Sequence, residues 1–173
     1  AHNEEMVNEL GDTISNVAKD DNVRVLLLTG AGRAFCAGAD FRFGEVREGK
    51  LSPHVAEDMG SFLAKQKLGY LPLEFAAKII LPLQRLDKPT VAVINGDAAG
   101  GGLEIALACD IRIGSEKARF SVGYTKIGIP PDNGTTWFLP RIVGIGKALE
   151  LILAAEVCTA EEAYRIGLLN KLV

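Results

Sequence analysis

Three consecutive glycines and a single carboxylate stand together where an apolar segment ends. Gly100, Gly101 and Gly102 follow the apolar stretch 88–95, and Glu104 comes two residues after them, within a short apolar segment. Glycine has no Cβ, so a ligand can approach its backbone N–H closely. The first N–H groups of a helix lack internal partners and carry partial positive charge. These residues predict a site for an oxyanion, with Glu104 beside it as an acid or base.

A second turn of small residues follows the other apolar run of this kind. Ala37, Gly38 and Ala39 come after the stretch 23–29, as the glycine triplet comes after 88–95. Ligands of parallel α/β folds bind beyond the carboxyl ends of the strands, so both turns are expected to face one crevice and offer converging N–H donors. The alternative is that the glycines allow close packing of a helix on a sheet and that the carboxylate is a solvated helix cap.

A nucleotide site is the first alternative for a glycine-rich loop, and the residues argue against it. The segment 30–35 begins Gly-x-Gly but has Phe35 where a dinucleotide-binding loop needs its third glycine. The segment 96–104 lacks the Lys-Ser/Thr pair of a phosphate-binding P-loop.

Composition excludes several classes of protein. The formal net charge is −3 and no basic stripe is present, so no nucleic-acid partner is expected. The three cysteines are widely spaced, which fits neither a disulfide framework nor a metal site and favours a reducing, cytoplasmic compartment (Cys36, Cys109, Cys158). No apolar stretch is long enough for a membrane span, and the first residues do not resemble a signal peptide.

The elements that must position these residues alternate along the chain. Asn3 is the expected cap of a helix with an apolar stripe at Met6, Leu10, Ile14 and Val17. Stretches 23–29 and 88–95 are predicted strands buried on both faces. Further helices are predicted at 55–68, 71–86, 102–109, 135–143, 147–155 and 160–166, loops at 30–40 and 125–134, and strand-like pieces at 110–116 and 118–122. This alternation predicts one α/β domain with a mainly parallel sheet.

Four stretches also carry a resemblance to a known family. They are AFCAGADF (34–41), KPTVAVINGDAAGGGLEIALACDIRIGSEKARFSV (88–122), KIGIPPDNGTTWFLPRIVG (126–144) and TAEEAYRIGLLNKLV (159–173). Together they resemble the crotonase superfamily of enoyl-CoA hydratases and isomerases. The resemblance implies a crotonase-like core domain over 1–173, with a mainly parallel sheet of repeated ββα units surrounded by helices. It also implies that an opening β-hairpin and C-terminal helices are missing, as if both ends were cut from a longer chain.

The family generates an enolate from a coenzyme A thioester whose oxygen is held by two backbone amides. Carried over, the resemblance implies that the amides of Ala39 and Gly101 are the oxyanion donors. It implies no cofactor beyond the coenzyme A moiety of an acyl-CoA substrate, and no metal. The turns around these amides are expected to meet the substrate (Ala37, Gly38, Asp40, Gly100), and Arg42 is either near a coenzyme A phosphate or an ordinary surface charge.

The acids decide the reaction. Family hydratases use two glutamates, and Glu104 matches the first, whereas Tyr124 occupies the position of the second. Tyr124 is then a core or pocket-wall residue, or its hydroxyl orients a water or the acyl group. Asp132 falls where some isomerases and aromatic-CoA dehalogenases of the family carry a functional aspartate, although an Asp before Asn-Gly is by default a turn residue.

Four other residues have types that occur in binding or catalytic sites (Trp137, His54, Cys36, His2). Trp137 is either the wall of an aromatic acyl pocket or a buried packing residue. His54 is expected to be solvated, Cys36 to be a small buried residue, and His2 supports no prediction.

The resulting hypothesis is an enoyl-CoA hydratase or isomerase with Glu104, Asp132 or both as acid and base. The alternatives are a non-catalytic acyl-CoA-binding protein, a dehalogenase in which Asp132 attacks, and a hydrolase. The resemblance also suggests a homotrimer or a pair of trimers.

Overall fold

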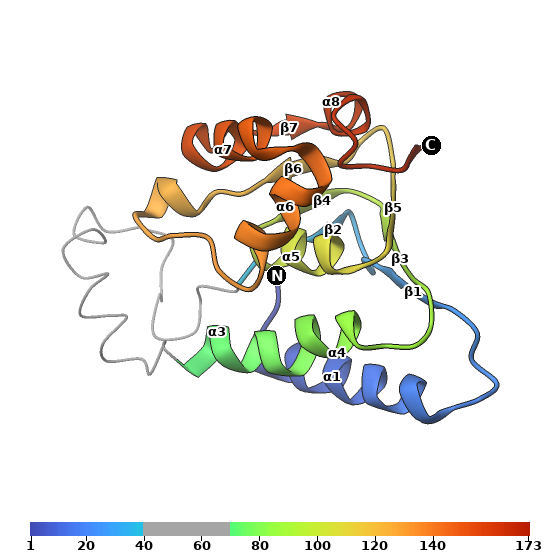
Figure 1. Ribbon diagram of the computed structural model, residues 1–173. Coiled ribbons are helices and arrows are strands. Elements are labelled where there is room, and N and C mark those ends of the chain that lie inside the picture. Colours follow the sequence, from blue (N-terminus) through green and yellow to red (C-terminus); the bar gives the residue numbers. More distant parts are fainter. Residues whose placement is uncertain (40–69) are drawn as a thin grey trace.

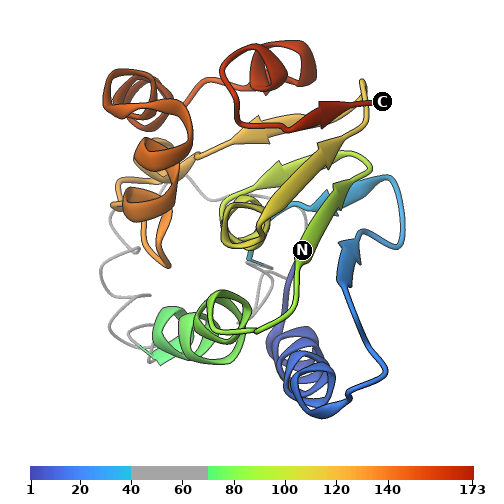
Figure 2. The same ribbon diagram turned by 45° about the vertical axis from the view of Figure 1, so that its right-hand side comes forward.

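Two four-stranded sheets organise the molecule, with helices packed around them (Figures 1 and 2). The structure is a computed structural model that describes residues 1–39 and 70–173. One sheet has the order β1-β3-β5-β8 and the other β2-β4-β6-β7. All neighbouring strands are parallel except β6 and β7. The strands are β1 Leu26–Thr29, β2 Ala34–Cys36, β3 Thr90–Ile94, β4 Asp97–Ala99, β5 Ile111–Gly114, β6 Arg119–Ser121, β7 Cys158–Thr159 and β8 Lys171–Leu172.

Strands β1 to β6 alternate between the two sheets, which produces repeated ββα units. β3 and β4 precede helix α5 (Gly101–Ala108), and β5 and β6 precede α6 (Thr135–Val143). Helices α7 (Ile145–Ala154) and α8 (Ala160–Arg165) complete the C-terminal part. The predicted fold class, α/β with a mainly parallel sheet, is therefore confirmed. Within the described ranges, no helix combines the length and the hydropathy that crossing a membrane requires.

Helix α1 (Glu4–Lys19) begins and ends as the sequence predicts. The Asn3 side chain accepts a hydrogen bond of 2.8 Å from the backbone N–H of Met6, which satisfies one of the free donors of the first turn. Ile14 is buried in the core, and the helix ends at Asp20.

One helical segment covers Tyr70 to Gln84 despite the proline at position 82. It consists of α3 (Tyr70–Phe75), a π-helical turn (Ala76–Ile80) and α4 (Leu81–Gln84). The Leu81 N–H donates to the Ala76 carbonyl, five residues back. This wider turn places Pro82 in the first turn of α4, where a missing N–H is tolerated. The helix predicted over 71–86 is confirmed, and the one predicted over 55–68 lies outside the described residues.

Three predictions about strands are wrong. The loop predicted over 30–40 contains β2, and a second short strand, β4, precedes the glycine triplet. The strand predicted over 23–29 starts only at Leu26, and the Leu27 side chain is 62% exposed rather than buried. β1 is the edge strand of its sheet, so only part of its surface is covered by described elements.

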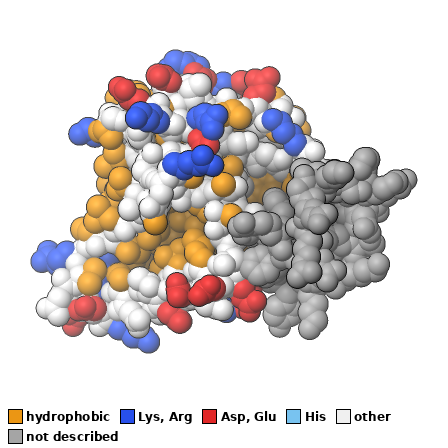
Figure 3. Space-filling view, turned by 180° about the vertical axis from the view of Figure 1, so that it is seen from behind, with side chains coloured by type: hydrophobic (Ala, Val, Ile, Leu, Met, Phe, Trp, Pro, Cys, Tyr) orange, Lys and Arg blue, Asp and Glu red, His pale blue; other side chains and the backbone are white. Residues whose placement is uncertain are grey.

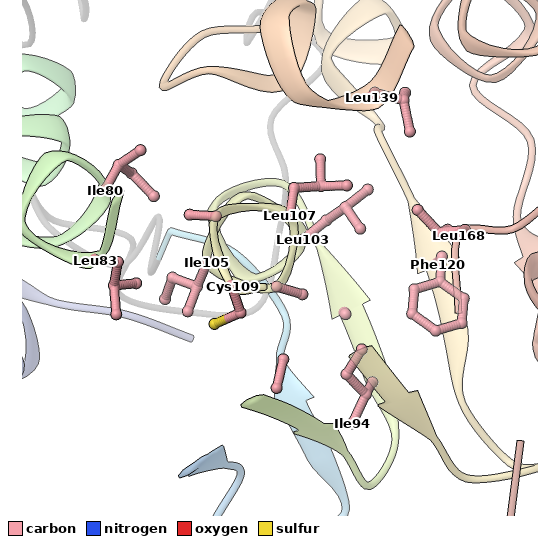
Figure 4. Packing of buried hydrophobic residues seen from close by; sticks show 14 of the residues in the cluster. Ile80, Leu83, Ile94, Leu103, Ile105, Leu107, Cys109, Phe120, Leu139 and Leu168 are labelled. Atoms are coloured by element: carbon pink, nitrogen blue, oxygen red, sulfur yellow. The ribbon is translucent and has the colours of Figure 1, made fainter. Parts of the chain in front are cut away.

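Helix α5 lies at the centre of the core and is buried along its whole length. Figure 4 shows Ile105 on the side of α5 that faces Ile80 and Leu83, and Leu103 and Leu107 on the side that faces Leu139 and Leu168. A helix that is apolar on all sides belongs in the interior. The one charged side chain on α5, Glu104, is consequently held at a fixed place inside the molecule.

An apolar hollow of about 270 Å³ lies on the opposite side of the molecule from the view of Figure 1 (Figure 3). It is lined mainly by α1, β1 and β2, with Leu10, Leu28 and Phe35 among its residues. None of the carboxylates discussed below lines it.

Candidate active site

The two small-residue turns lie side by side because the strands before them are paired. β2 and β4 are parallel neighbours, with Cys36 opposite Ala98. Gly38, at φ +95°, lies so close to the second turn that a Cβ on it would be 3.0 Å from the Ala99 carbonyl oxygen. The two turns therefore follow the carboxyl ends of β2 and β4, not of the strands predicted over 23–29 and 88–95.

The glycines of the triplet have different roles. Gly100 has φ +49° and ψ −124°, a backbone conformation that favours glycine. A Cβ on Gly102 would lie 2.0 Å from the Cys36 carbonyl oxygen, so this glycine permits close packing of α5 on β2. A Cβ on Gly101 would collide with the side chain of His2. The packing interpretation thus holds for Gly102, while Gly101 faces the site.

The amides proposed as oxyanion donors are free of partners among the residues that the structure describes. Gly100 donates its N–H to the Ser121 carbonyl at 3.1 Å, but neither Ala39 nor Gly101 donates to a described residue. Ala37 is exposed at the start of the first turn. Asp40, Arg42 and His54 lie outside the described residues.

Glu104 is completely buried and hydrogen-bonded on both carboxyl oxygens. Its Oε1 accepts from the Tyr124 hydroxyl and, at 3.2 Å, from the Thr135 hydroxyl. Its Oε2 accepts from the Asn133 side-chain amide at 3.1 Å. The alternative of a solvated helix cap is therefore wrong for this residue.

The environment of Glu104 favours its neutral form. Burial, together with the negative charge of Asp132, raises the pKa of Glu104 to about 8, against the opposing effect of the hydrogen bonds from Tyr124 and Asn133. At neutral pH the carboxyl group therefore keeps its proton.

Asp132 lies close enough to Glu104 and to the Tyr124 hydroxyl to raise the pKa of both groups, and its charge also acts on His2. Its carbonyl accepts from the Thr135 N–H at 2.9 Å, in a turn that continues through Asn133 at φ +42°. The turn role and the site role of Asp132 are compatible, because this same turn brings the side chains of residues 132, 133 and 135 to one carboxyl group.

Tyr124 is half-buried, and its hydroxyl donates to Glu104, which neither of the roles expected for it included. Burial and the adjacent carboxyl groups raise the pKa of Tyr124 far above its usual range, so the hydroxyl stays a donor. Trp137 is 57% exposed, with the Arg141 guanidinium over its ring at 3.3 Å. The packing interpretation of Trp137 is therefore wrong, and no described hydrogen bond connects its side chain to the carboxyl pair. Cys36 is buried, as expected.

Sequence reasoning missed three residues of the site: His2, Asn133 and Thr135. The His2 ring stacks on Phe75 with the centroids 4.5 Å apart, and its Nε2 lies 2.3 Å from where a Cβ on Gly101 would be. In the sequence, the only signal for Asn133 is its place in an Asp-Asn-Gly turn. No spacing pattern along the chain predicts that residue 2 contacts residue 101.

A family model and individual relatives both match this chain. Residues 1–173 match the sequence model of the enoyl-CoA hydratase/isomerase family. Crotonyl-CoA hydratase of Syntrophomonas wolfei is 37% identical over 174 residues, which cover 100% of this chain and 60% of the relative. 1,2-Epoxyphenylacetyl-CoA isomerase of Escherichia coli K12 is 37% identical over 171 residues, which cover 99% of this chain and 60% of that relative.

A solved structure confirms the predicted crotonase-like fold. The crystal structure of an enoyl-CoA hydratase from Bacillus anthracis superposes with a TM-score of 0.85 at 33% identity, covering 99% of this chain and 60% of that one. The chain thus spans about three fifths of the length of the relatives that it matches.

Proposed function

The chain belongs to the enoyl-CoA hydratase/isomerase family, and on this premise we propose that it binds an acyl-CoA thioester and shifts a double bond in the acyl group through an enolate. The observation that carries the proposal is the Glu104–Asp132 carboxyl pair, in which helix α5 supplies Glu104 and the turn before α6 supplies Asp132, close enough to raise the pKa of Glu104. Moving a double bond requires a proton to leave one carbon and return to another, which is work for an acid–base pair.

The thioester oxygen is proposed to sit between the amides of Ala39 and Gly101. Both turns lie side by side, and both N–H groups lack a described partner. Removing one donor of such a pair typically costs about 3–4 kcal/mol of transition-state stabilisation. Ala37, Gly38 and Gly100 form the backbone around these amides and would meet the adjacent part of coenzyme A, and the roles of Asp40 and Arg42 stay predictions. Proton transfer needs only the groups named here, so we propose no cofactor beyond the coenzyme A moiety.

Asp132 is proposed as the base and Glu104 as its neutral partner. A protonated carboxyl group accepts three hydrogen bonds and donates one. Tyr124, Thr135 and Asn133 supply three donors to Glu104, and its own proton is left for Asp132. Asp132 then carries the negative charge of the pair and takes the proton from the acyl group.

The same hydrogen bonds favour isomerisation over hydration. A hydratase must hold a water molecule, and in the neutral state Glu104 has no acceptor position left for it. Hydration is the second candidate, since Asp132 can still orient a water. A dehalogenase needs an aromatic pocket. Trp137 does not support one, because its side chain is at the surface and one face of its ring packs against the Arg141 guanidinium.

The test is turnover of a 3-enoyl-CoA and of crotonyl-CoA, followed by absorbance. Asp132→Asn is expected to reduce isomerisation by about 10²–10⁴-fold, because the base is removed. Asp87→Asn, on the exposed surface, is the matched control and should leave the rate unchanged. If Asp132→Asn and Glu104→Gln both turn over at the native rate, the assignments are wrong. Binding without turnover would instead identify an acyl-CoA-binding protein, and release of free coenzyme A would identify a hydrolase.

We further propose a cytoplasmic homotrimer or pair of trimers. Helix α7 supports self-association, since Ile145, Leu149 and Leu153 are spaced one turn apart along it and are 72%, 50% and 70% exposed. Sedimentation of the native protein should give a multiple of three chains. A monomer at micromolar concentration would refute the assembly.

A further inference from the structure

The hydrogen bonds to Glu104 are divided unequally between its two carboxyl oxygens. Oε1 accepts from two hydroxyl groups, that of Tyr124 and, at 3.2 Å, that of Thr135. Oε2 accepts from one described residue, through the Asn133 side-chain amide at 3.1 Å. In a neutral carboxyl group the carbonyl oxygen can accept two hydrogen bonds, whereas the oxygen that carries the proton donates one and accepts one. The division therefore matches a neutral group in which Oε1 is the carbonyl oxygen.

The surroundings of Glu104 supply no positive charge that would hold it as a carboxylate. Its side chain is 0% exposed, and no lysine, arginine or histidine in the described part of the chain forms an ion pair with it. A buried carboxylate without a cation is so costly that the group keeps its proton instead. Burial and the nearby charge of Asp132 raise the pKa of Glu104 to about 8, which agrees with a neutral group.

Thr135 has a single acceptor for its hydroxyl proton. Its side chain is 1% exposed in the first turn of α6, and among the described residues its hydroxyl bonds only Glu104. A buried hydroxyl that does not donate loses free energy, so the Thr135 proton points at Oε1. The backbone N–H of Thr135 donates to the Asp132 carbonyl at 2.9 Å, which anchors the residue to the turn before α6. Thr135 thus contacts both members of the carboxyl pair.

Asn133 reaches the other oxygen from a left-handed backbone. Its φ is +42°, and Gly134 follows at φ +93°. Asparagine tolerates this conformation better than most residues do, and glycine adopts it without strain. The NH₂ group of the Asn133 amide can only donate, so it uses one acceptor position of Oε2 and leaves the other position of that oxygen for a proton.

We propose that the proton of Glu104 is held on Oε2, and that Thr135 is a positioning residue that keeps it there because its hydroxyl and that of Tyr124 fill both acceptor positions of Oε1. Oε2 is then the oxygen through which Glu104 gives up its proton and takes it back. This use of Oε2 in catalysis rests on the proposed function, whereas the place of the proton follows from the hydrogen bonds. Loss of either hydroxyl frees a position on Oε1, so that the proton is shared between the two oxygens.

Infrared spectroscopy of the protein without substrate distinguishes the two oxygens. The C=O stretch of a neutral carboxyl group moves to higher frequency when the carbonyl oxygen loses a hydrogen bond, and it responds much less when the hydroxyl oxygen loses one. Glu104→Gln identifies the band by removing it. Thr135→Val keeps the shape of the side chain and should raise the frequency, and Thr135→Ser should restore it. Asn133→Gly keeps the left-handed backbone and should leave the frequency nearly unchanged, as should the control Thr136→Val at the neighbouring exposed threonine.

The opposite pattern would overturn the proposal. If Asn133→Gly raises the frequency and Thr135→Val does not, Oε2 is the carbonyl oxygen and the proton is on Oε1. The absence of any neutral carboxyl band that Glu104→Gln removes would also contradict it, because Glu104 would then be ionised. Should Thr135→Val fail to fold, Tyr124→Phe removes the other donor to Oε1 and should produce the same rise.

Turnover separates this inference from the proposed function. Thr135→Val should lower kcat for the isomerisation by about tenfold, with a smaller change in KM, because one hydrogen bond to the acid is lost. If the infrared shifts are as expected but Asp132→Asn turns over at the native rate, the proton is placed correctly and the proposed function fails. If Asp132→Asn is inactive while Thr135→Val keeps the native frequency and kcat, the proposed function stands and the role of Thr135 is wrong.

Discussion

Glu104 links the pH of the solution to the stability of the fold. Its pKa is raised from 4.5 to about 8, so between these values the folded chain binds a proton that the unfolded chain has released. The stability that Glu104 contributes is therefore fully present below its pKa in the unfolded chain, and it is lost as the pH rises through its pKa in the folded chain. Below about pH 6.5 the lowered pKa of His2 opposes this effect, because the unfolded chain then binds the extra proton. We therefore predict that the free energy of unfolding falls between about pH 6.5 and pH 8, by up to about 1.4 kcal/mol per pH unit, and that Glu104→Gln flattens this slope.

Urea denaturation at a series of pH values measures this slope. Glu156→Gln is the matched control, because Glu156 is exposed and the substitution should leave the slope unchanged. A native slope in Glu104→Gln would mean that Glu104 is already ionised in the folded protein.

Tyr124 supports Glu104 in a way that a phenylalanine cannot. Its hydroxyl donates to Oε1 and lowers the pKa of Glu104 against the effect of burial. Tyr124→Phe should raise the pKa of Glu104 further and lower stability by about 1–2 kcal/mol at neutral pH, because a buried acceptor loses a partner. Tyr164→Phe, at an exposed tyrosine, is the control. Equal urea midpoints for the two variants would contradict this role for Tyr124.

The members of the site differ in how much of their position the sequence reveals. Glu104 lies two residues after the glycine triplet, in the first turn of the same helix, so its place beside the turn results from local structure. Asp132 was identified through a resemblance, since a turn residue has the same local pattern. Thr135 and His2 meet the site only because α6 and the first residues pack against α5. Such contacts depend on tertiary packing, which no local spacing encodes.

Among the elements, α5 depends most directly on its glycines. A Cβ at Gly102 would lie 2.0 Å from the backbone oxygen of Cys36, and backbone in a paired strand cannot easily move away. Gly102→Ala is expected to cost several kcal/mol of stability, through overpacking.

Gly146→Ala in α7 is the opposite case, because no atom lies within 4 Å of its added Cβ. It should stabilise the protein by about 0.5–1 kcal/mol. Thermal unfolding compares the two, and a neutral Gly102→Ala would show that β2 and α5 are less tightly packed.

The elements predicted correctly are those with a strong periodic pattern or a cap. Helix α1 has both, and α6 was predicted with its observed ends. Strands β2 and β4 have three residues each, rich in alanine, which is too short for alternation to show. They exist because they pair with each other and β4 pairs with β6, so their signal lies in residues distant along the chain.

At the scale of the molecule, Arg112 ties the C-terminal segment to the core. It lies in β5 and is 7% exposed, and its Nε donates to the Leu168 carbonyl at 2.8 Å while Nη1 donates to the Cys109 carbonyl at 2.6 Å. The backbone N–H of Arg112 donates to the Asn170 Oδ1 at 2.8 Å, and the Asn170 N–H donates to the Arg112 carbonyl at 2.8 Å. One buried guanidinium thus joins the end of α5 to the segment that follows α8.

Loss of this guanidinium should loosen the C-terminal segment before the rest of the fold. Arg112→Met keeps much of the side-chain volume but leaves two buried carbonyls without partners, which should lower stability by about 2–4 kcal/mol. Hydrogen exchange should accelerate first at residues 168–173, because β8 pairs only with β5 among the described strands. Arg119→Met is the control, since Arg119 pairs with Asp97 at the surface and should change neither measurement. Uniformly faster exchange over the whole chain would contradict a local role for Arg112, because it would show that the C-terminal segment unfolds only together with the core.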